Sequence, residues 1–344
     1  MTDPVLEISR SAFRRNVAEV RRRIAPSELL LVMKDDAYGF GVEWSVPQAA
    51  QAGVEWFGGY DIATALRIRA LTDRRVYAWA TSGTSEIEAA LSAGIDLGIG
   101  SRAYLRDVIT TAARTGGTAR VHLKIDTGLH RNGFRPEQWP DAVREALEAE
   151  RQGALQVVGV WSHLAEASDA EDDAAQRVFL DAVAQLRASG GSPEVLHLTA
   201  SAAAWWRPEL RGSLSRIGAF CYGIRSADGP ALDGLTLIGR LSAEVLSVDE
   251  DGVRVGIGAF HGLPSILAGA EVGTPGGRRR ILSIAGAEML VAAWDGAAAG
   301  QRVSVFGPGG DGESDATSLA ERIDTVGEEI ITRLTPAVRR VVCD

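Results

Sequence analysis

The sequence predicts an α/β protein in which a (β/α)8, TIM-like barrel is followed by a smaller, β-rich C-terminal domain. Eight apolar runs of strand length alternate with amphipathic helical stretches before about residue 225. After Gly223 the pattern changes to short alternating runs between glycine-bearing turns. Alternating strands and helices are typical of parallel sheets with helical crossovers, and eight such strands close a barrel. The length of 344 residues also exceeds what one small core requires.

Each barrel strand is predicted by an apolar run rich in β-branched residues. The eight runs are 29–33, 55–60, 76–82, 96–100, 120–126, 155–163, 195–201 and 214–220. Four of the connecting stretches carry apolar residues at helical spacing, namely 85–94, 102–114, 140–152 and 170–191. A doubly wound open sheet is the rival fold, but no G-x-G-x-x-G follows the first strand.

The C-terminal third predicts antiparallel strands. Residues 224–234 are rich in Gly, Pro and Asp and predict a linker, so we place the domains at 1–228 and 229–344. Roughly the first ten residues are candidates for pairing with the second domain. The strands are predicted at 237–248, 252–260, 279–286, 288–294 and 301–307, and residues 318–334 predict one amphipathic helix.

Charge and composition exclude several classes of protein. The net charge of −9 argues against nucleic acid as a partner, because neutralising phosphates requires a surplus of Lys and Arg. The first ten residues, MTDPVLEISR, lack the features of a signal peptide, and no apolar run approaches the roughly 20 residues that span a bilayer. The two cysteines, Cys221 and Cys343, are too few for a disulfide framework. We therefore expect a cytoplasmic protein without nucleic-acid or membrane partners.

Candidate chemistry gathers where the predicted strands end, which is where barrels carry their active sites. The polar residues at these ends are Lys34, Tyr38, Lys124, Asp126, His130, Arg131, His163, His197, Thr199, Ser201 and Arg216, the last followed by Gly218 and Ala219. Taken singly, Lys34 would be a surface lysine, and His122 and His197 would be hydrogen-bonded structural groups. Because these residues lie together at one rim of the predicted barrel, a functional site is favoured over these separate structural interpretations.

The residue types on this rim suit an anionic cofactor and an imine-forming nucleophile. The five histidines stand singly, with no H-x-x-x-H or H-E-x-x-H spacing, which disfavours a metal centre. Few carboxylates are available for two-carboxylate hydrolysis. A desolvated lysine forms Schiff bases with carbonyls, and Ser201 and the amides after Arg216 could hold a phosphate.

At this point the motifs resemble those of alanine racemases, which are fold-type III enzymes dependent on pyridoxal 5′-phosphate (PLP). The stretch VMKDDAYGFG at 32–41 resembles the family's K-A-x-A-Y-G-x-G segment. The stretches VHLKIDTGLHRNGF, GVWSHLA, HLTASAAA, SLSRIGAFCYGI and SDATSLAERIDTVGEEIITRL resemble five further family segments in the same order. The resemblance therefore covers almost the whole chain.

This resemblance implies a role for each rim residue. Lys34 would bind PLP as an aldimine, and Tyr38, Ser201 and the amides of Gly218 and Ala219 would bind the cofactor phosphate. Arg216 would face the pyridine nitrogen, with His163 behind it. Arg131 would contact the PLP phenolic oxygen and the substrate carboxylate. Lys124 matches a lysine that some members carry as a carbamate.

The resemblance weakens in the C-terminal domain. There the family lends a catalytic tyrosine to the partner subunit, from a segment like V-G-Y-A-D-G-Y-P. In the matching stretch 255–264, VGIGAFHGLP, Ala259 aligns with that tyrosine. Shifting the alignment by two residues aligns Ile257 with it instead. His261 or a water could replace the tyrosine as a base, and His261 would share a face with Ala259 if the segment is extended.

Two further family residues are also absent: an aspartate becomes Ala285, and a phosphate-binding tyrosine falls near Pro336. Three hypotheses stay open. The chain is an amino-acid racemase-like isomerase, or a one-base PLP enzyme that decarboxylates an amino acid or exchanges its α-proton with retention, or a PLP-binding protein without turnover. The resemblance also implies a homodimer.

Overall fold

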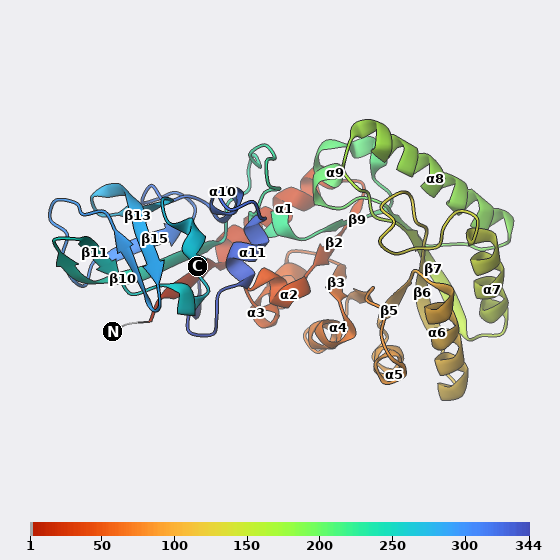
Figure 1. Ribbon diagram of the computed structural model, residues 1–344. Coiled ribbons are helices and arrows are strands. Elements are labelled where there is room, and N and C mark those ends of the chain that lie inside the picture. Colours follow the sequence, from red (N-terminus) through yellow and green to blue (C-terminus); the bar gives the residue numbers. More distant parts are fainter. Residues whose placement is uncertain (1–2) are drawn as a thin grey trace. The chain divides into compact units, whose positions relative to one another are not determined.

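The chain packs as two compact units. The structure is a computed structural model that describes residues 3–344. The barrel unit consists of Val20–Lys34 and Val42–Gly218, and the β unit consists of the residues up to Glu19, Asp35–Gly41 and Ala219–Asp344. Figure 1 traces the strands and helices of both units. The division into domains at residue 228 stays a prediction.

All eight predicted barrel strands form in the barrel unit, and each pairs in parallel with its neighbours. Their order is β9 (Leu214–Ile217), β2 (Glu28–Val32), β3 (Trp56–Tyr60), β4 (Arg75–Ala78), β5 (Asp96–Ile99), β6 (Ala119–Lys124), β7 (Leu155–Trp161) and β8 (Val195–His197). The two end strands meet where the Leu196 N–H donates to Ser213 Oγ at 2.8 Å and the Arg216 N–H donates to the Thr199 carbonyl at 3.2 Å. The predicted parallel (β/α)8 barrel is confirmed.

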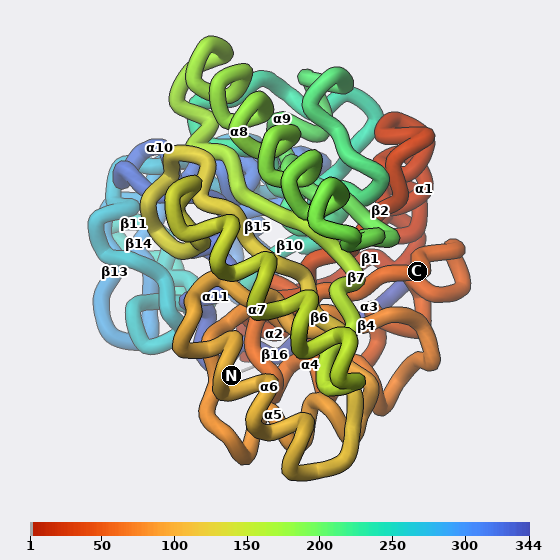
Figure 2. Tube along the Cα trace, turned by 90° about the vertical axis from the view of Figure 1, so that its right-hand side faces the viewer, coloured from red at the N-terminus to blue at the C-terminus, as the bar shows by residue number. Residues whose placement is uncertain are grey.

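The barrel helices cover the outside of these strands. In the view of Figure 2 the helices α5, α6, α7 and α8 follow one another from the bottom of the picture to the top. Ser101 caps α6 by accepting the Tyr104 N–H, and Gly116, with φ of 69°, ends it. The helices are α3 (Val42–Gln51), α4 (Ile62–Arg69), α5 (Thr84–Ser92), α6 (Arg102–Thr115), α7 (Trp139–Arg151), α8 (Asp169–Ala188) and α9 (Ser201–Trp206), with the 3-10 turn η1 (Pro208–Leu210); α1 (Arg10–Ile24) contains the boundary between the two units.

The barrel interior is unusually polar along β6. Alternate residues of a strand share a face, so Arg120, His122 and Lys124 line successive layers of the interior. Glycines on the neighbouring strands make room for this filling. A Cβ at Gly159 would lie 2.5 Å from His122 Nδ1, and a Cβ at Gly98 would lie 2.5 Å from the Tyr77 hydroxyl.

The β unit is built on one eight-stranded sheet. The strand order is β11 (Gly252–Val255), β14 (Glu288–Val291), β13 (Gly277–Ala285), β12 (Glu271–Thr274), β15 (Arg302–Phe306), β10 (Gly239–Asp249), β1 (Val5–Ser9) and β16 (Arg339–Cys343). All pairs are antiparallel except β1 with β16, and β11 also pairs with β10, so six strands close on themselves. The remaining elements of this unit are α10 (Ala316–Glu321), α11 (Gly327–Thr332), η2 (Ala219–Tyr222), η3 (Ala259–His261) and η4 (Ser265–Leu267). Helix α2 (Lys34–Tyr38) begins at Lys34, the last residue of the first barrel segment, and continues in the β unit.

Two sequence predictions in the β unit are wrong in detail. The single helix predicted at 318–334 is two helices, because Asp324 adopts φ of 55° and the Thr325 N–H turns back to the Ala320 carbonyl. The strand predicted at 252–260 ends at Val255, and a 3-10 turn follows at Ala259–His261. Between residues 3 and 344 no helix is both long enough and apolar enough to cross a membrane.

Candidate active site

Lys34 follows β2 and precedes a turn whose backbone is left-handed. The Met33 N–H continues the pairing to β3 by donating to the Gly58 carbonyl at 2.8 Å. The next four residues, Asp35 to Tyr38, all have φ between 53° and 56°, which is the left-handed region. The turn closes where the Gly39 N–H donates to the Asp35 carbonyl at 2.8 Å. Left-handed backbone costs roughly 1–2 kcal/mol per non-glycine residue, and such strain concentrates at functional sites.

Arg216 is a buried cation of the barrel unit that is held by several hydrogen bonds. It is 4% exposed, and its guanidinium donates to the carbonyl oxygens of Ser162 at 2.7 Å, His197 at 2.8 Å and Leu198 at 3.2 Å. It also donates to His197 Nδ1 at 3.2 Å and to His163 Nδ1 at 3.1 Å. All five acceptors are neutral, so the guanidinium charge is not cancelled by the groups that hold it.

His163 lies where the cationic side chains of the rim converge. Burial first, and then the charges of Arg216, Arg131, Lys124 and Lys34, lower the pKa of His163 to about 3. The imidazole is therefore neutral at neutral pH. The four cations come from the ends of three strands, because Lys34 follows β2, Arg216 lies in β9, and Lys124 ends β6 with Arg131 in the loop after it.

Lys124 is the second unusual lysine. Lys34 and Lys124 are the two lysines of the whole chain. Burial, together with the charges of Arg216 and Arg131, lowers the pKa of Lys124 to about 8, and its Nζ lies 4.5 Å from the centre of the Trp161 ring. A sizeable neutral fraction is therefore present near neutral pH, which makes this amine nucleophilic.

The carboxylate of Asp126, two residues after Lys124, already has hydrogen-bond partners of its own. Asp126 accepts the backbone N–H groups of Gly128 at 3.1 Å and His130 at 3.0 Å, and it contacts His130 Nδ1 at 2.9 Å. Over residues 3–344 no carboxylate forms an ion pair with Lys124, Arg131 or Arg216. These three cations of the rim therefore have no ion-pair partner among the described residues, although the charges of Asp126 and Glu166 act on Lys124 and Arg216, and Arg131 is exposed to solvent.

The predicted phosphate residues are divided between the units. Ser201 is the first residue of α9, and Gly218 is the last residue of the barrel unit. In the β unit, the Ala219 amide hydrogen-bonds the buried Tyr38 hydroxyl, and the Tyr38 ring packs 5.2 Å from that of Tyr222. Burial is the main cause that raises the pKa of Tyr38 well above its ordinary value, so the phenol stays protonated.

His261 does not lie on an extended segment, so the condition for sharing a face with Ala259 is not met. The Gly258 N–H donates to His261 Nδ1 at 3.0 Å, and Gly262 follows with φ of 91°, which together close the 3-10 turn η3. Residues two apart in such a turn point in different directions, so His261 does not share a face with Ala259. Burial lowers the pKa of His261 below its ordinary value.

Sequence reasoning missed how His122 and His197 are connected. Both are hydrogen-bonded, as the sequence interpretation expects: His197 contacts Arg216 directly, and His122 Nδ1 lies 2.9 Å from His197 Nε2. Asp96, which was not considered, contacts His122 Nε2 at 3.2 Å. The alternation Arg120-Val121-His122-Leu123-Lys124 was the available signal, because it places three polar side chains on one face of a barrel strand.

The residues of this rim fit a phosphorylated carbonyl compound. Lysine supplies an amine that can form a Schiff base, and the cations of the rim suit an anionic ligand. Fold and site thus define the class of protein: a (β/α)8 barrel with a reactive lysine beside a buried arginine, followed by a β-rich unit.

Comparisons with known proteins specify this class. The family model for the N-terminal domain of alanine racemase matches residues 8–226. Alanine racemases of Thermobifida fusca and Beutenbergia cavernae are each 35% identical to this chain, over 95% of it and 94% of the relative. The crystal structure of alanine racemase from D-cycloserine-producing Streptomyces lavendulae superposes with a TM-score of 0.93 at 31% identity, covering 100% of this chain and 98% of that one. The chain belongs to the alanine racemase family.

Proposed function

We propose that this protein is an amino-acid racemase that uses PLP held by Lys34. The observation that carries the proposal is the convergence of Lys34, Lys124, Arg131 and Arg216 on the neutral His163. Such a cluster is costly unless an anion occupies it. Because the relatives it matches are named alanine racemases, alanine is the substrate to test first.

The barrel residues would divide the work by their chemistry. PLP, when bound, supplies an electron sink that acidifies the α-hydrogen of the attached amino acid. The Lys34 amine would hold the cofactor and then take and return the proton on its own face. Arg216 can only donate hydrogen bonds, and burial lowers its pKa only to about 10, so it would present a positive charge to the cofactor ring. Arg131 would bind the substrate carboxylate.

The phosphate would be bound by neutral donors. These donors would be Ser201, Tyr38 and the backbone amides of Gly218 and Ala219.

The opposite face of the substrate needs a group other than tyrosine, because residues 255–264 contain no tyrosine. His261 or a water would act there. His261 Nδ1 already accepts the Gly258 N–H, so Nε2 would be the atom that carries the proton. If no group acts on that face, the one-base hypothesis applies.

Because the chain contains two lysines, cofactor attachment can be assigned directly. The protein would be incubated with PLP, reduced with borohydride and mapped by mass spectrometry. We expect the label on Lys34, its loss in Lys34→Ala, and its retention in Lys124→Arg. A wild-type protein that takes up no PLP, or that carries it on Lys124, would contradict the proposal.

A further inference from the structure

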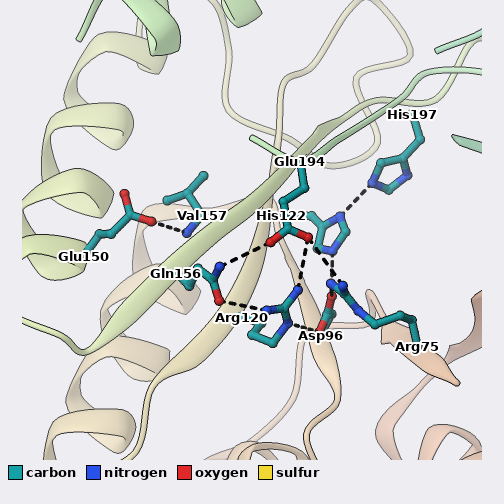
Figure 3. Close-up of polar contacts among 9 residues, drawn as sticks. All are labelled: Arg75, Asp96, Arg120, His122, Glu150, Gln156, Val157, Glu194 and His197. Carbon is teal, nitrogen blue, oxygen red and sulfur yellow. Dashed lines mark hydrogen bonds and ion pairs between the residues drawn. The ribbon is translucent and has the colours of Figure 1, made fainter. Parts of the chain in front are cut away.

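A continuous hydrogen-bonded chain crosses the barrel core behind Arg216. It runs from Arg216 to His197 Nδ1 at 3.2 Å, from His197 Nε2 to His122 Nδ1 at 2.9 Å, and from His122 Nε2 to Asp96 at 3.2 Å. These four residues are 4%, 0%, 0% and 1% exposed. Figure 3 shows this series of hydrogen bonds without Arg216: His197, His122 and Asp96 point toward one another from three strands. We call these four residues the core relay.

The hydrogen bonds of the core relay can point in only one direction. A guanidinium group only donates, so His197 Nδ1 must accept and the His197 proton must be on Nε2. That N–H then donates to His122 Nδ1, which places the His122 proton on Nε2, facing the Asp96 carboxylate. Reversing the chain would aim a His197 N–H at the guanidinium of Arg216. Each histidine therefore has one permitted tautomer, fixed by its two neighbours.

Both imidazoles of the relay are neutral. Burial is the largest cause that lowers the pKa of His122 below its ordinary value, although Asp96 opposes it. Burial also lowers the pKa of His197 well below its ordinary value, and the neighbouring His122 and Arg216 act in the same direction. Neutral imidazoles with their lone pairs toward Arg216 act as aligned dipoles that favour its positive charge.

Asp96 is held at the far end of the relay by its own cations. It contacts Arg75 at 2.8 Å and Arg120 at 2.9 Å, and Figure 3 shows Glu194 bridging these arginines and Gln156. Burial alone would raise the pKa of Asp96, but the His122 hydrogen bond and Arg75 outweigh it, and the pKa lies below its ordinary value. The carboxylate end of the relay is therefore fixed as an acceptor.

We propose that His122 and Asp96 are positioning residues, which act through His197 to fix the orientation of the Arg216 guanidinium that faces the cofactor. Barrel interiors are usually filled with branched apolar side chains, so a polar line through the core is costly unless every member is satisfied. Here each relay atom has a partner. This inference rests on the proposed function, because the role of Arg216 comes from it.

The first test measures the relay in the protein without cofactor. Histidine-selective ¹⁵N labelling and NMR report the tautomer of each ring directly. We expect His122 and His197 to be neutral and to carry the proton on Nε2 at about pH 7 to 8. If either ring is protonated there, or carries its proton on Nδ1, the relay is wrong, whether or not PLP binds.

The second test uses His122→Phe, which keeps a ring but removes both hydrogen bonds. Tyr77→Phe is the matched control, because its ring centroid lies 4.6 Å from that of His122 and its buried hydroxyl has no partner among the described residues. In the PLP-loaded enzyme we expect His122→Phe to lower kcat about tenfold with KM within about twofold, and to shift the pH titration of the bound-cofactor absorbance. Tyr77→Phe should match the wild type.

A third variant covers the case in which His122→Phe fails to fold. Asp96→Asn keeps the shape of the side chain but removes its charge, and we expect a smaller shift of the same absorbance titration. If a loaded, folded His122→Phe or Asp96→Asn enzyme behaves like Tyr77→Phe, the two residues are merely structural and the proposal is overturned. Failure of the wild type to load PLP would instead defeat the proposed function, and the tautomer measurement would still decide the relay.

Discussion

At the scale of single residues, the site depends on side chains held in states that they would not adopt in water. Four consecutive residues after Lys34 have left-handed backbone, and none of them is glycine. His163 is neutral because burial and four surrounding cations oppose its protonation. Both features cost free energy of folding, and both place unusual groups beside the lysine that we propose to hold the cofactor.

Substituting Asp35 tests the left-handed turn. Asp35 is exposed and has φ of 53°, so Asp35→Val should lower the free energy of unfolding by roughly 1–2 kcal/mol, whereas Asp35→Gly should leave it unchanged or raise it slightly. Urea denaturation measures both. At Glu148, an exposed residue inside α7, the order should reverse, because glycine is the worse helix former. The same order at both positions would contradict the strained turn.

The pH dependence of stability tests the neutral state of His163. An ordinary unfolded histidine binds a proton below a pKa of about 6.5, but the folded pKa is about 3. The unfolded state therefore binds more protons between these values, so stability falls as the pH is lowered from about 6.5 toward 3. Denaturation at a series of pH values should show a shallower fall for His163→Gln than for the wild type. Parallel curves would show that His163 is protonated in the folded state.

At the scale of elements, local patterns predicted what local physics determines. The eight barrel strands follow from apolar runs. Because barrels carry their active sites where the strands end, the strand predictions also select the candidate site residues. The short strands β12 and β16 were not predicted as strands, because four- and five-residue segments are stabilised by partners distant in the sequence. The core relay was missed for a similar reason, since its hydrogen bonds join β5, β6, β8 and β9.

The break between α10 and α11 gives a prediction at this scale. Gly327 begins α11, and a Cβ there would lie 2.6 Å from Thr317 Oγ1 and 2.8 Å from the Ile224 side chain. Gly327→Ala should therefore lower the free energy of unfolding by roughly 1–3 kcal/mol. Gly117→Ala is the control, because its nearest neighbour lies 3.6 Å away. Thermal unfolding compares the two, and equal midpoints would show that the helix junction can widen freely.

At the scale of the whole molecule, membership of the alanine racemase family rests on matches along nearly the full chain. A single chain does not show how copies assemble, so the homodimer stays a proposal. One surface of the β unit supports it. Phe260 is 73% exposed, Ile266 is 71% exposed and Leu282 is 45% exposed. Phe260 and Ile266 lie on η3 and η4, whose flanking backbone is hydrogen-bonded to the strand that carries Leu282 and to its turn.

Charge on this apolar surface should separate the copies. We expect the double variant Phe260→Asp, Ile266→Asp to be monomeric in analytical ultracentrifugation, where the wild type is dimeric. Leu180→Asp is the control, because Leu180 is 52% exposed on α8 of the barrel unit, and it should leave the assembly unchanged. A monomeric wild type, or a double variant that still dimerises, would contradict this assignment of the interface.

The central claim is that Lys34 and a group on the opposite face move the α-proton of an amino acid. The most direct test incubates the PLP-loaded protein with L- and D-alanine in D₂O and follows both deuterium at Cα and configuration. We predict incorporation with inversion from either enantiomer, and its loss in Lys34→Ala. Deuterium with retained configuration, release of carbon dioxide, or no exchange across a panel of amino acids would contradict the racemase assignment.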